Sequence, residues 1–187
     1  CLKTFDELCH VVPGGRRCVA ALSGDTVPPL AALGAEVEIV GLQGTRREPV
    51  AGIRSKDGAH PLTLGPSDIV VAIHIPGSPE RRLAAYEKWA PRKSVDFPQV
   101  SVAIVCDRDS ADRISHLEIV VGALGPRPKS IRKLDQFMGD PITDSLAEAV
   151  SAQVVKQVQH LPNVLGEPTY RQRVLGVLVK RRLASWG

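Results

Sequence analysis

A short turn of small and acidic residues, Ser23-Gly24-Asp25, is the passage of this sequence best suited to bind a ligand. Small residues let backbone N–H groups approach a ligand closely, and the Asp25 carboxylate can accept hydrogen bonds from it. Pro28 and Pro29 follow and fit the first turn of a helix, where a missing N–H costs nothing. The same pattern also fits an ordinary turn that leads into a helix and a strand. The turn is therefore a candidate binding site with a structural alternative.

A second candidate is the segment 1–18, which holds three of the four cysteines, Cys1, Cys9 and Cys18. Thiolates are soft ligands that suit iron and zinc. The spacing lacks the close Cys-x2-Cys pair of most metal sites, so free cysteines are the alternative, and disulfides are not expected in a cytosolic protein. His10 is interpreted as an exposed loop histidine rather than a substitute ligand. Cys106 shares the parity of an apolar strand and is expected in the core.

No set of nucleophile, base and acid is visible, so no catalytic residue is predicted. Ser115 and His116 are adjacent, and their side chains would point to opposite faces of a strand.

The elements that must position these residues alternate between strands and helices. Strands are predicted around Val37 and Ile39, from Thr45, at 69–76, at 100–106 and at 117–121. Three helices are predicted in the last third of the chain: a short one capped by Ser130 and ended by Gly139, and two with capping-box spacings, at 145–161 (Ser145 with Glu148) and at 169–183 (Thr169 with Gln172). A boundary is predicted at 77–82, where an apolar strand gives way to Gly, Pro and charge.

Composition excludes several classes of protein. The 187 residues are 43% hydrophobic, which favours an ordinary folded core over disorder. The net charge of +4 comes from scattered basic residues without interleaved aromatic residues, so nucleic-acid binding is not expected. No apolar run of membrane-spanning length and no secretion signal is present in the sequence, so neither a membrane span nor secretion is expected and the predicted location is cytoplasmic.

The turn and the helix after it resemble the second FAD-contacting segment of the flavoprotein (medium) subunits of the molybdenum hydroxylase family. That family includes xanthine dehydrogenase, carbon monoxide dehydrogenase and 4-hydroxybenzoyl-CoA reductase. The residues that carry this part of the resemblance are Asp25, Pro29, Leu30, Ala32, Leu33, Ala35, Val37 and Glu38. A second motif, at positions 86–97, is similar to the start of the family's C-terminal domain. Its matching residues are Tyr86, Lys88, Arg92, Asp96 and Phe97.

The resemblance implies an α+β fold: the latter part of an FAD-binding domain of the molybdopterin dehydrogenase type at 1–76, then a small domain of antiparallel strands packed with about three helices at 81–187. It implies FAD as the cofactor, bound by Ser23, Gly24 and Asp25. Ile69 and Val70 match a strand that lends apolar contacts to the flavin. Lys88 is implied to reach the flavin edge and favour negative charge there.

Within the family, Cys1, Cys9 and Cys18 resemble the last three ligands of a [4Fe-4S] loop found in the 4-hydroxybenzoyl-CoA reductase branch. That branch implies reductive dehydroxylation of an aromatic acyl-CoA and a donor such as ferredoxin. The family as a whole implies two partners, a small iron–sulfur subunit and a large molybdenum-cofactor subunit. A flavin subunit of the carbon monoxide or xanthine dehydrogenase type is the alternative, and a non-enzymatic protein-interaction module is an alternative of another class.

Two expectations concern the extent of the chain. It begins with Cys rather than Met, which suggests the C-terminal piece of a longer polypeptide whose earlier part would carry a Gly-rich pyrophosphate loop and a fourth cysteine ligand. This piece alone is then expected to bind FAD weakly and the cluster poorly. Residues 81–187 are expected to fold without the first 80, because the predicted helices can cover the predicted strands.

Overall fold

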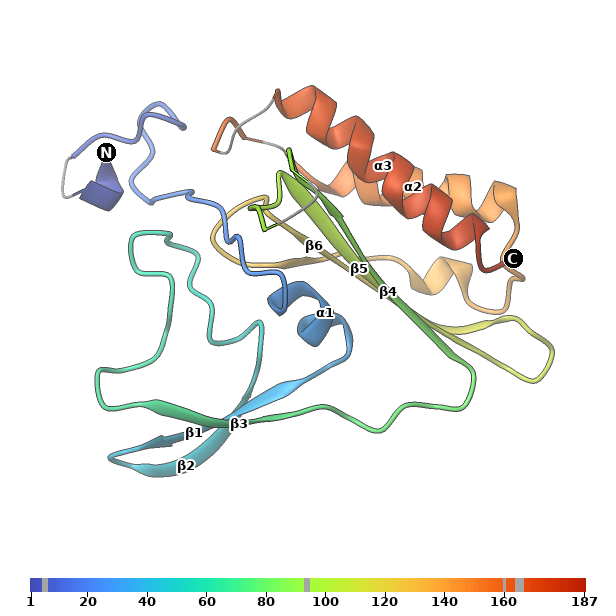
Figure 1. The fold of residues 1–187 in the computed structure, drawn as a ribbon, viewed down its shortest axis with the longest axis horizontal. Coiled ribbons are helices and arrows are strands. Elements are labelled where there is room, and N and C mark those ends of the chain that lie inside the picture. Colours follow the sequence, from blue (N-terminus) through green and yellow to red (C-terminus); the bar gives the residue numbers. More distant parts are fainter. Residues whose placement is uncertain (5–6, 93–94, 160, 164–166) are drawn as a thin grey trace.

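The fold consists of two antiparallel sheets and the helices that cover them (Figure 1). The structure is a computed structural model and describes residues 1–4, 7–92, 95–159, 161–163 and 167–187. Antiparallel strands with a few helices are the α+β architecture that the sequence predicts. Within these ranges no helix is both long enough and apolar enough to cross a lipid bilayer.

A short helix, α1 (Val27–Ala32), follows the Ser23-Gly24-Asp25 turn, as predicted. Its first turn contains the two prolines, and Gly34 adopts a φ of +69°, the left-handed conformation that ends many helices. The chain then enters the first sheet within two residues. The turn, the helix and the strand are therefore a single compact unit.

The first sheet has the order β2-β1-β3, formed by β1 (Glu36–Gly41), β2 (Gly44–Pro49) and β3 (Ile69–His74). Val37 and Ile39 of β1 are buried against Val27 and Ala35, which confirms the predicted alternation. β3 ends at His74, two residues earlier than predicted, and lies at the edge of the sheet. Its apolar side chains are largely exposed, since no other strand of the described chain pairs with its outer side.

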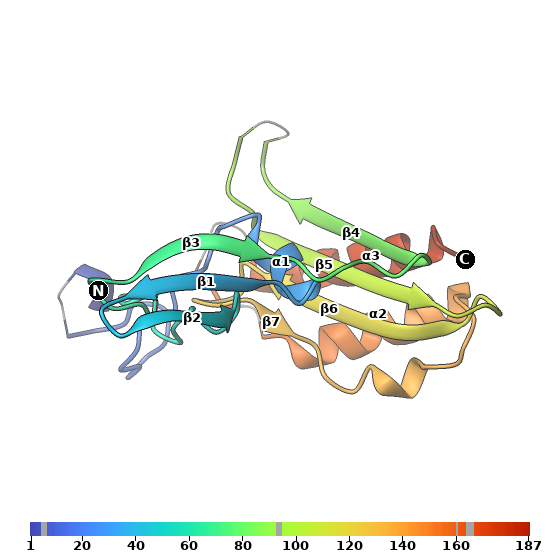
Figure 2. The same ribbon diagram turned by 90° about the horizontal axis from the view of Figure 1, so that it is seen from below.

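The second sheet has the order β4-β5-β6-β7, formed by β4 (Arg82–Trp89), β5 (Val100–Arg108), β6 (Ile114–Gly122) and β7 (Lys129–Ser130). Two long helices, α2 (Asp144–Gln157) and α3 (Pro168–Ala184), cover one face. The alternate residues of β5, including Cys106, belong to this main core, as predicted. Figure 2 shows the two sheets lying end to end, with α1 between them.

The opposite face of the second sheet is covered by α1, which comes from the first part of the chain (Figure 1). Ala32 packs there against Ala103, Val105 and Val120. β5 is therefore buried on both faces, and only its last residue, Arg108, is partly exposed. The two predicted domains share this interface.

Three predicted helix caps are wrong, although the two long helices begin within one residue of the predicted positions. Ser130 lies in β7, and between β7 and α2 the chain forms a 3-10 turn, η2 (Asp135–Phe137), instead of the predicted helix. Lys133 adopts a positive φ of 60° there, which a continuous helix from Ser130 would not allow. Thr143, not Ser145, caps α2 by accepting a hydrogen bond from the Leu146 N–H. Glu167, not Thr169, caps α3 through its carboxylate. The predicted tail of α2 includes residue 160, which lies outside the described residues.

Candidate flavin site

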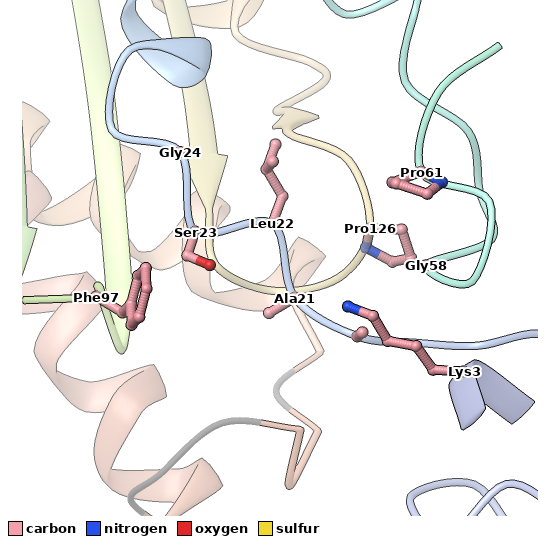
Figure 3. A pocket seen from close by; sticks show the side chains of 10 residues that line it. Lys3, Ala21, Leu22, Ser23, Gly24, Gly58, Pro61, Phe97 and Pro126 are labelled. Carbon is pink, nitrogen blue, oxygen red and sulfur yellow. The ribbon is translucent and has the colours of Figure 1, made fainter. Parts of the chain in front are cut away.

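Ser23 and Gly24 line a cavity of about 330 Å³ beside the N-terminal segment and the loops at one end of the second sheet (Figure 3), whereas Asp25 lies next to the cavity wall. The cavity wall runs through Ala20 to Gly24 and is completed by residues from four other places in the chain: Lys3, Gly58, Pro61, Phe97 and Pro126. Its volume lies at the lower end of the range of ligand pockets. It could therefore hold part of a large cofactor such as a flavin.

Asp25 is the meeting point of the two parts of the chain. Its carboxylate accepts hydrogen bonds from the Tyr86 hydroxyl at 3.0 Å and the Lys88 ammonium at 2.6 Å. Tyr86 and Lys88 are two residues apart on β4, so their side chains share one face of that strand. The structure thus brings together three residues that the sequence identified from separate segments.

The charges of Lys88 and Asp25 cancel within this cluster. The ammonium is 23% exposed and the carboxylate 45% exposed, so water screens the pair. Burial raises the pKa of Tyr86 to about 12, and its hydrogen bond to the Asp25 carboxylate contributes to the rise. Tyr86 is therefore a protonated donor at neutral pH. Lys88 is thus half of an ion pair rather than an isolated cation, and none of Asp25, Tyr86 and Lys88 lines the cavity itself.

Phe97 is a cavity-wall residue to which the sequence reasoning assigned no role. The side chain lines the cavity beside Ser23 and is 75% exposed (Figure 3). An exposed aromatic ring at a cavity wall is a stacking surface for a planar ligand. Phe97 was one of the residues that resemble the start of the family's C-terminal domain, and that resemblance could have pointed to it. Asp96, whose carboxylate pairs with Arg92 at 3.1 Å, also accepts the backbone N–H of Phe97.

Ile69 and Val70 do not line this cavity. They lie at the start of β3 with 64% and 40% of their surfaces exposed. Asp68 just before them forms a two-pronged ion pair with Arg46 at 2.7 and 3.0 Å, which lowers the pKa of that carboxyl to about 2. Their apolar contact with a flavin stays a prediction.

The structure does not bring Cys1, Cys9 and Cys18 together as a ligand set. Over the ranges that the structure describes, no three His, Cys, Asp or Glu side chains are placed to hold a metal ion. Cys18 is buried, its backbone N–H donates to Asp57 at 3.1 Å and its carbonyl accepts from Gly58 at 2.9 Å. Packing against the 57–58 turn, rather than metal ligation, accounts for its position. The residues present do not fit an iron–sulfur cluster.

His74, in the strand predicted at 69–76, has a hydrogen-bonding partner within the sheet. Its Nε2 lies 2.7 Å from the Glu38 carboxylate on the neighbouring strand β1. That hydrogen bond is the first cause of the lowered pKa of Glu38. The basic residues at the end of α3 also have structural partners, since Lys180 pairs with Glu148 and Arg182 with Glu87.

Comparison with known proteins identifies the family. Residues 84–185 match the family model described as the CO dehydrogenase flavoprotein C-terminal domain, which is more than half of the chain. The chain belongs to the CO dehydrogenase flavoprotein family. Residues 12–78 match a second model, described as the FAD binding domain in molybdopterin dehydrogenase. Asp25 thus lies in the match to the FAD-binding domain, and Tyr86 and Lys88 lie in the match to the C-terminal domain.

Relatives of this flavoprotein include the nicotine 6-hydroxylase medium subunit of Paenarthrobacter nicotinovorans, 26% identical over 178 residues. That alignment covers 93% of the chain and 60% of the relative. Two solved structures share the fold. One is carbon monoxide dehydrogenase from Hydrogenophaga pseudoflava, with a TM-score of 0.77, 22% identity, and coverage of 88% of this chain and 56% of that one. The other is quinoline 2-oxidoreductase from Pseudomonas putida 86, with a TM-score of 0.77, 19% identity, and coverage of 90% and 57%.

The flavoprotein therefore spans about 60% of the length of the relatives it matches. The family and the α+β fold that the sequence suggested are both supported by these matches. The matched relatives are a nicotine hydroxylase medium subunit, a carbon monoxide dehydrogenase and a quinoline oxidoreductase. A particular closeness to 4-hydroxybenzoyl-CoA reductase is not among these findings.

Proposed function

We propose that this chain is the FAD-binding, electron-transferring part of a molybdenum-containing oxidoreductase. The observation that carries the proposal is the cluster of Asp25 with Tyr86 and Lys88 beside the cavity wall. A binding site formed jointly by two matched domains is the arrangement expected for a ligand held between them.

The residues around the cavity fit a flavin. The exposed Phe97 ring offers a stacking surface, and the small residues Ser23 and Gly24 leave the backbone accessible. Beside the wall, the Tyr86 hydroxyl and the Lys88 ammonium both donate to Asp25 and hold its carboxylate in place. FAD, when bound, supplies the redox chemistry, and the chain's own residues bind and orient the cofactor and tune its electrostatic environment. No acid–base pair in this chain is needed for that task.

Among the enzymes of the family, we favour a hydroxylase or carbon monoxide dehydrogenase type over the 4-hydroxybenzoyl-CoA reductase type. The latter rested on Cys1, Cys9 and Cys18, which lie apart, so an extra [4Fe-4S] cluster and a ferredoxin donor lose their support in this chain. The proposed partners are a small iron–sulfur subunit and a large molybdenum-cofactor subunit. The electrons would pass between the flavin and the clusters of the small subunit.

The test is the reduction potential of FAD bound to the natural full-length polypeptide and any subunits that copurify with it. In Asp25→Asn the Lys88 cation loses its counter-ion, so the potential should rise. In Lys88→Met the Asp25 carboxylate is left unpaired, so the potential should fall. Each change should amount to about 1–3 kcal/mol in the free energy of reduction, the size of a Coulomb interaction over ~5–10 Å at an effective dielectric constant near 20.

The matched control is Lys180→Met, which breaks another exposed lysine–carboxylate pair, with Glu148 on α2. It should leave the potential unchanged, because α2 and α3 lie across the second sheet from α1 and the turn that precedes it. A full-length protein that binds no FAD, alone or with its partners, would refute the proposal and favour the interaction module. Shifts of the same sign in both site variants would exclude the assigned role of the ion pair.

A further inference from the structure

Arg171, in the first turns of α3, is a charged residue with no exposed surface. Burial lowers the pKa of its guanidinium. Buried charges are rare unless several hydrogen bonds hold them. The burial of this charge must therefore be explained by the hydrogen bonds that the guanidinium makes.

The guanidinium donates to three backbone carbonyls from three separate segments. Nε donates to Gln99 at 2.7 Å, Nη2 to Ala123 at 2.6 Å and Nη1 to Leu161 at 2.7 Å. No carboxylate of the described residues pairs with it. The guanidinium spreads its donors over three nitrogens in a rigid plane, whereas the three donors of a lysine radiate from a single nitrogen, so a lysine is not equivalent at this position.

Asn163 extends this network toward the cavity. Its side-chain amide donates to the carbonyls of Val19 at 2.6 Å and Leu124 at 3.0 Å, and its Oδ1 lies 3.4 Å from Arg171 Nη1. The same two segments that Asn163 joins are also bonded directly, because the Leu22 N–H donates to the Gly125 carbonyl at 2.8 Å. Two side chains thus join strand ends and loops that are far apart in sequence.

Apart from Leu161, the residues whose carbonyls accept these hydrogen bonds lie within three positions of a residue that lines the cavity. Gln99 is two residues after Phe97, Val19 directly precedes Ala20, and Leu124 is two residues before Pro126. Neither Arg171 nor Asn163 lines the cavity itself. The hydrogen-bond network of Arg171 and Asn163 therefore supports the cavity wall from outside the cavity.

We propose that Arg171 and Asn163 are positioning residues that fix the spacing of these three wall segments and thereby set the affinity for FAD. This inference rests on the proposed function. The physical reason is that loops held by buried hydrogen bonds keep the cavity preorganised, which reduces the entropy lost on binding.

The experiment compares Asn163→Asp and Asn163→Ala with Ser151→Ala in the natural full-length protein and any copurifying subunits. Asn163→Asp keeps an acceptor for Arg171 but turns an anionic oxygen toward the carbonyls of Val19 and Leu124. Asn163→Ala removes the amide without adding charge. Ser151 is the matched control, because its buried hydroxyl donates to Gly176 at 2.8 Å and ties α2 to α3 with no link to the cavity.

We expect both Asn163 variants to raise the dissociation constant of FAD by about tenfold or more, because each loses two hydrogen bonds to wall segments. Hydrogen exchange at the Leu22 amide in the FAD-free protein should accelerate by a similar factor. The visible circular dichroism of bound flavin should also change. Ser151→Ala should lower the melting temperature but leave all three measurements at their wild-type values.

Wild-type FAD affinity and wild-type Leu22 exchange in both Asn163 variants would overturn the inference while leaving the proposed function intact. Equal effects from Ser151→Ala would overturn it as well, because general destabilisation would then explain them. A wild-type protein that binds no FAD would overturn the proposed function, and the inference with it.

Discussion

At the scale of single residues, the sequence identified ionic groups but not their partners. Asp25 and Lys88 were both site candidates, and only the structure shows that they neutralise each other at 2.6 Å. The same holds for Arg82 and Asp107, directly opposite each other on β4 and β5. Their two hydrogen bonds, at 2.7 and 2.8 Å, join side chains that are only 14% and 11% exposed.

Asp107→Asn tests this pair through the pH dependence of stability. The hydrogen bonds from Arg82 are the first cause of the lowered pKa of Asp107, below the usual 3.8. The ionised carboxylate therefore stabilises the fold above about pH 3.8, and this contribution is lost as the pH falls through the folded-state pKa. At pH 7 the variant should lose about 2 kcal/mol in the free energy of unfolding.

Urea denaturation at neutral and acidic pH measures this difference. Because asparagine resembles a protonated aspartate, the gap between wild type and variant should close below the folded-state pKa. The control, Asp112→Asn, alters a 60% exposed carboxylate at a positive φ that asparagine tolerates, and should change stability by less than about 0.5 kcal/mol. A gap that persists unchanged at low pH would contradict the assigned ion pair.

At the scale of elements, local patterns predicted strands better than helix ends. The alternation of apolar residues located β1, because one buried face imposes a period of two. In β5 and the second half of β6 both faces are buried, and the apolar parity there marks the residues that face α2 and α3. Helix starts were displaced because several adjacent residues can serve as caps. Thr143 and Ser145 differ by two positions, and tertiary packing of Leu146 and Val150 selects which of them begins α2.

Thr143→Ala and Ser145→Ala test the assigned start of α2. Thr143 Oγ1 accepts the Leu146 N–H at 3.2 Å, so its loss should cost about 1 kcal/mol in the free energy of unfolding. Ser145 lies inside the first turn, and its replacement should cost less than about 0.5 kcal/mol. Chemical denaturation of both variants gives the comparison. The reverse order would restore Ser145 as the cap.

At the scale of the whole molecule, the deciding feature is the docking of α1 on the second sheet. This contact covers Ala103, Val105 and Val120, which residues 81–187 alone would expose. Independent folding of 81–187 stays a prediction, with a loss of stability now expected from that exposure. The main core between the sheet and its two long helices lies entirely within that part of the chain.

Gly122→Ala tests the docking directly. A Cβ at this position of β6 would meet the Ser101 hydroxyl and lie 2.8 Å from Pro28 Cγ of α1. Overpacking of this kind should cost about 1–3 kcal/mol and accelerate hydrogen exchange in α1. Gly77→Ala is the control, because nothing lies within 4 Å of its added Cβ. Unchanged exchange in α1 with Gly122→Ala would show that α1 is not held against this sheet as described.

The sequence by itself determined the family, most of the strands, the two long C-terminal helices and the turn at Ser23 to Asp25, because these depend on local periodicity, small residues and short motifs. Only the tertiary structure decided which distant groups meet: Asp25 with Tyr86 and Lys88, Arg171 with three backbone carbonyls, and Cys18 with the 57–58 turn instead of a metal. The physical reason is that a hydrogen bond or an ion pair depends on distances of about 3 Å, which the chain sets by packing and not by sequence spacing.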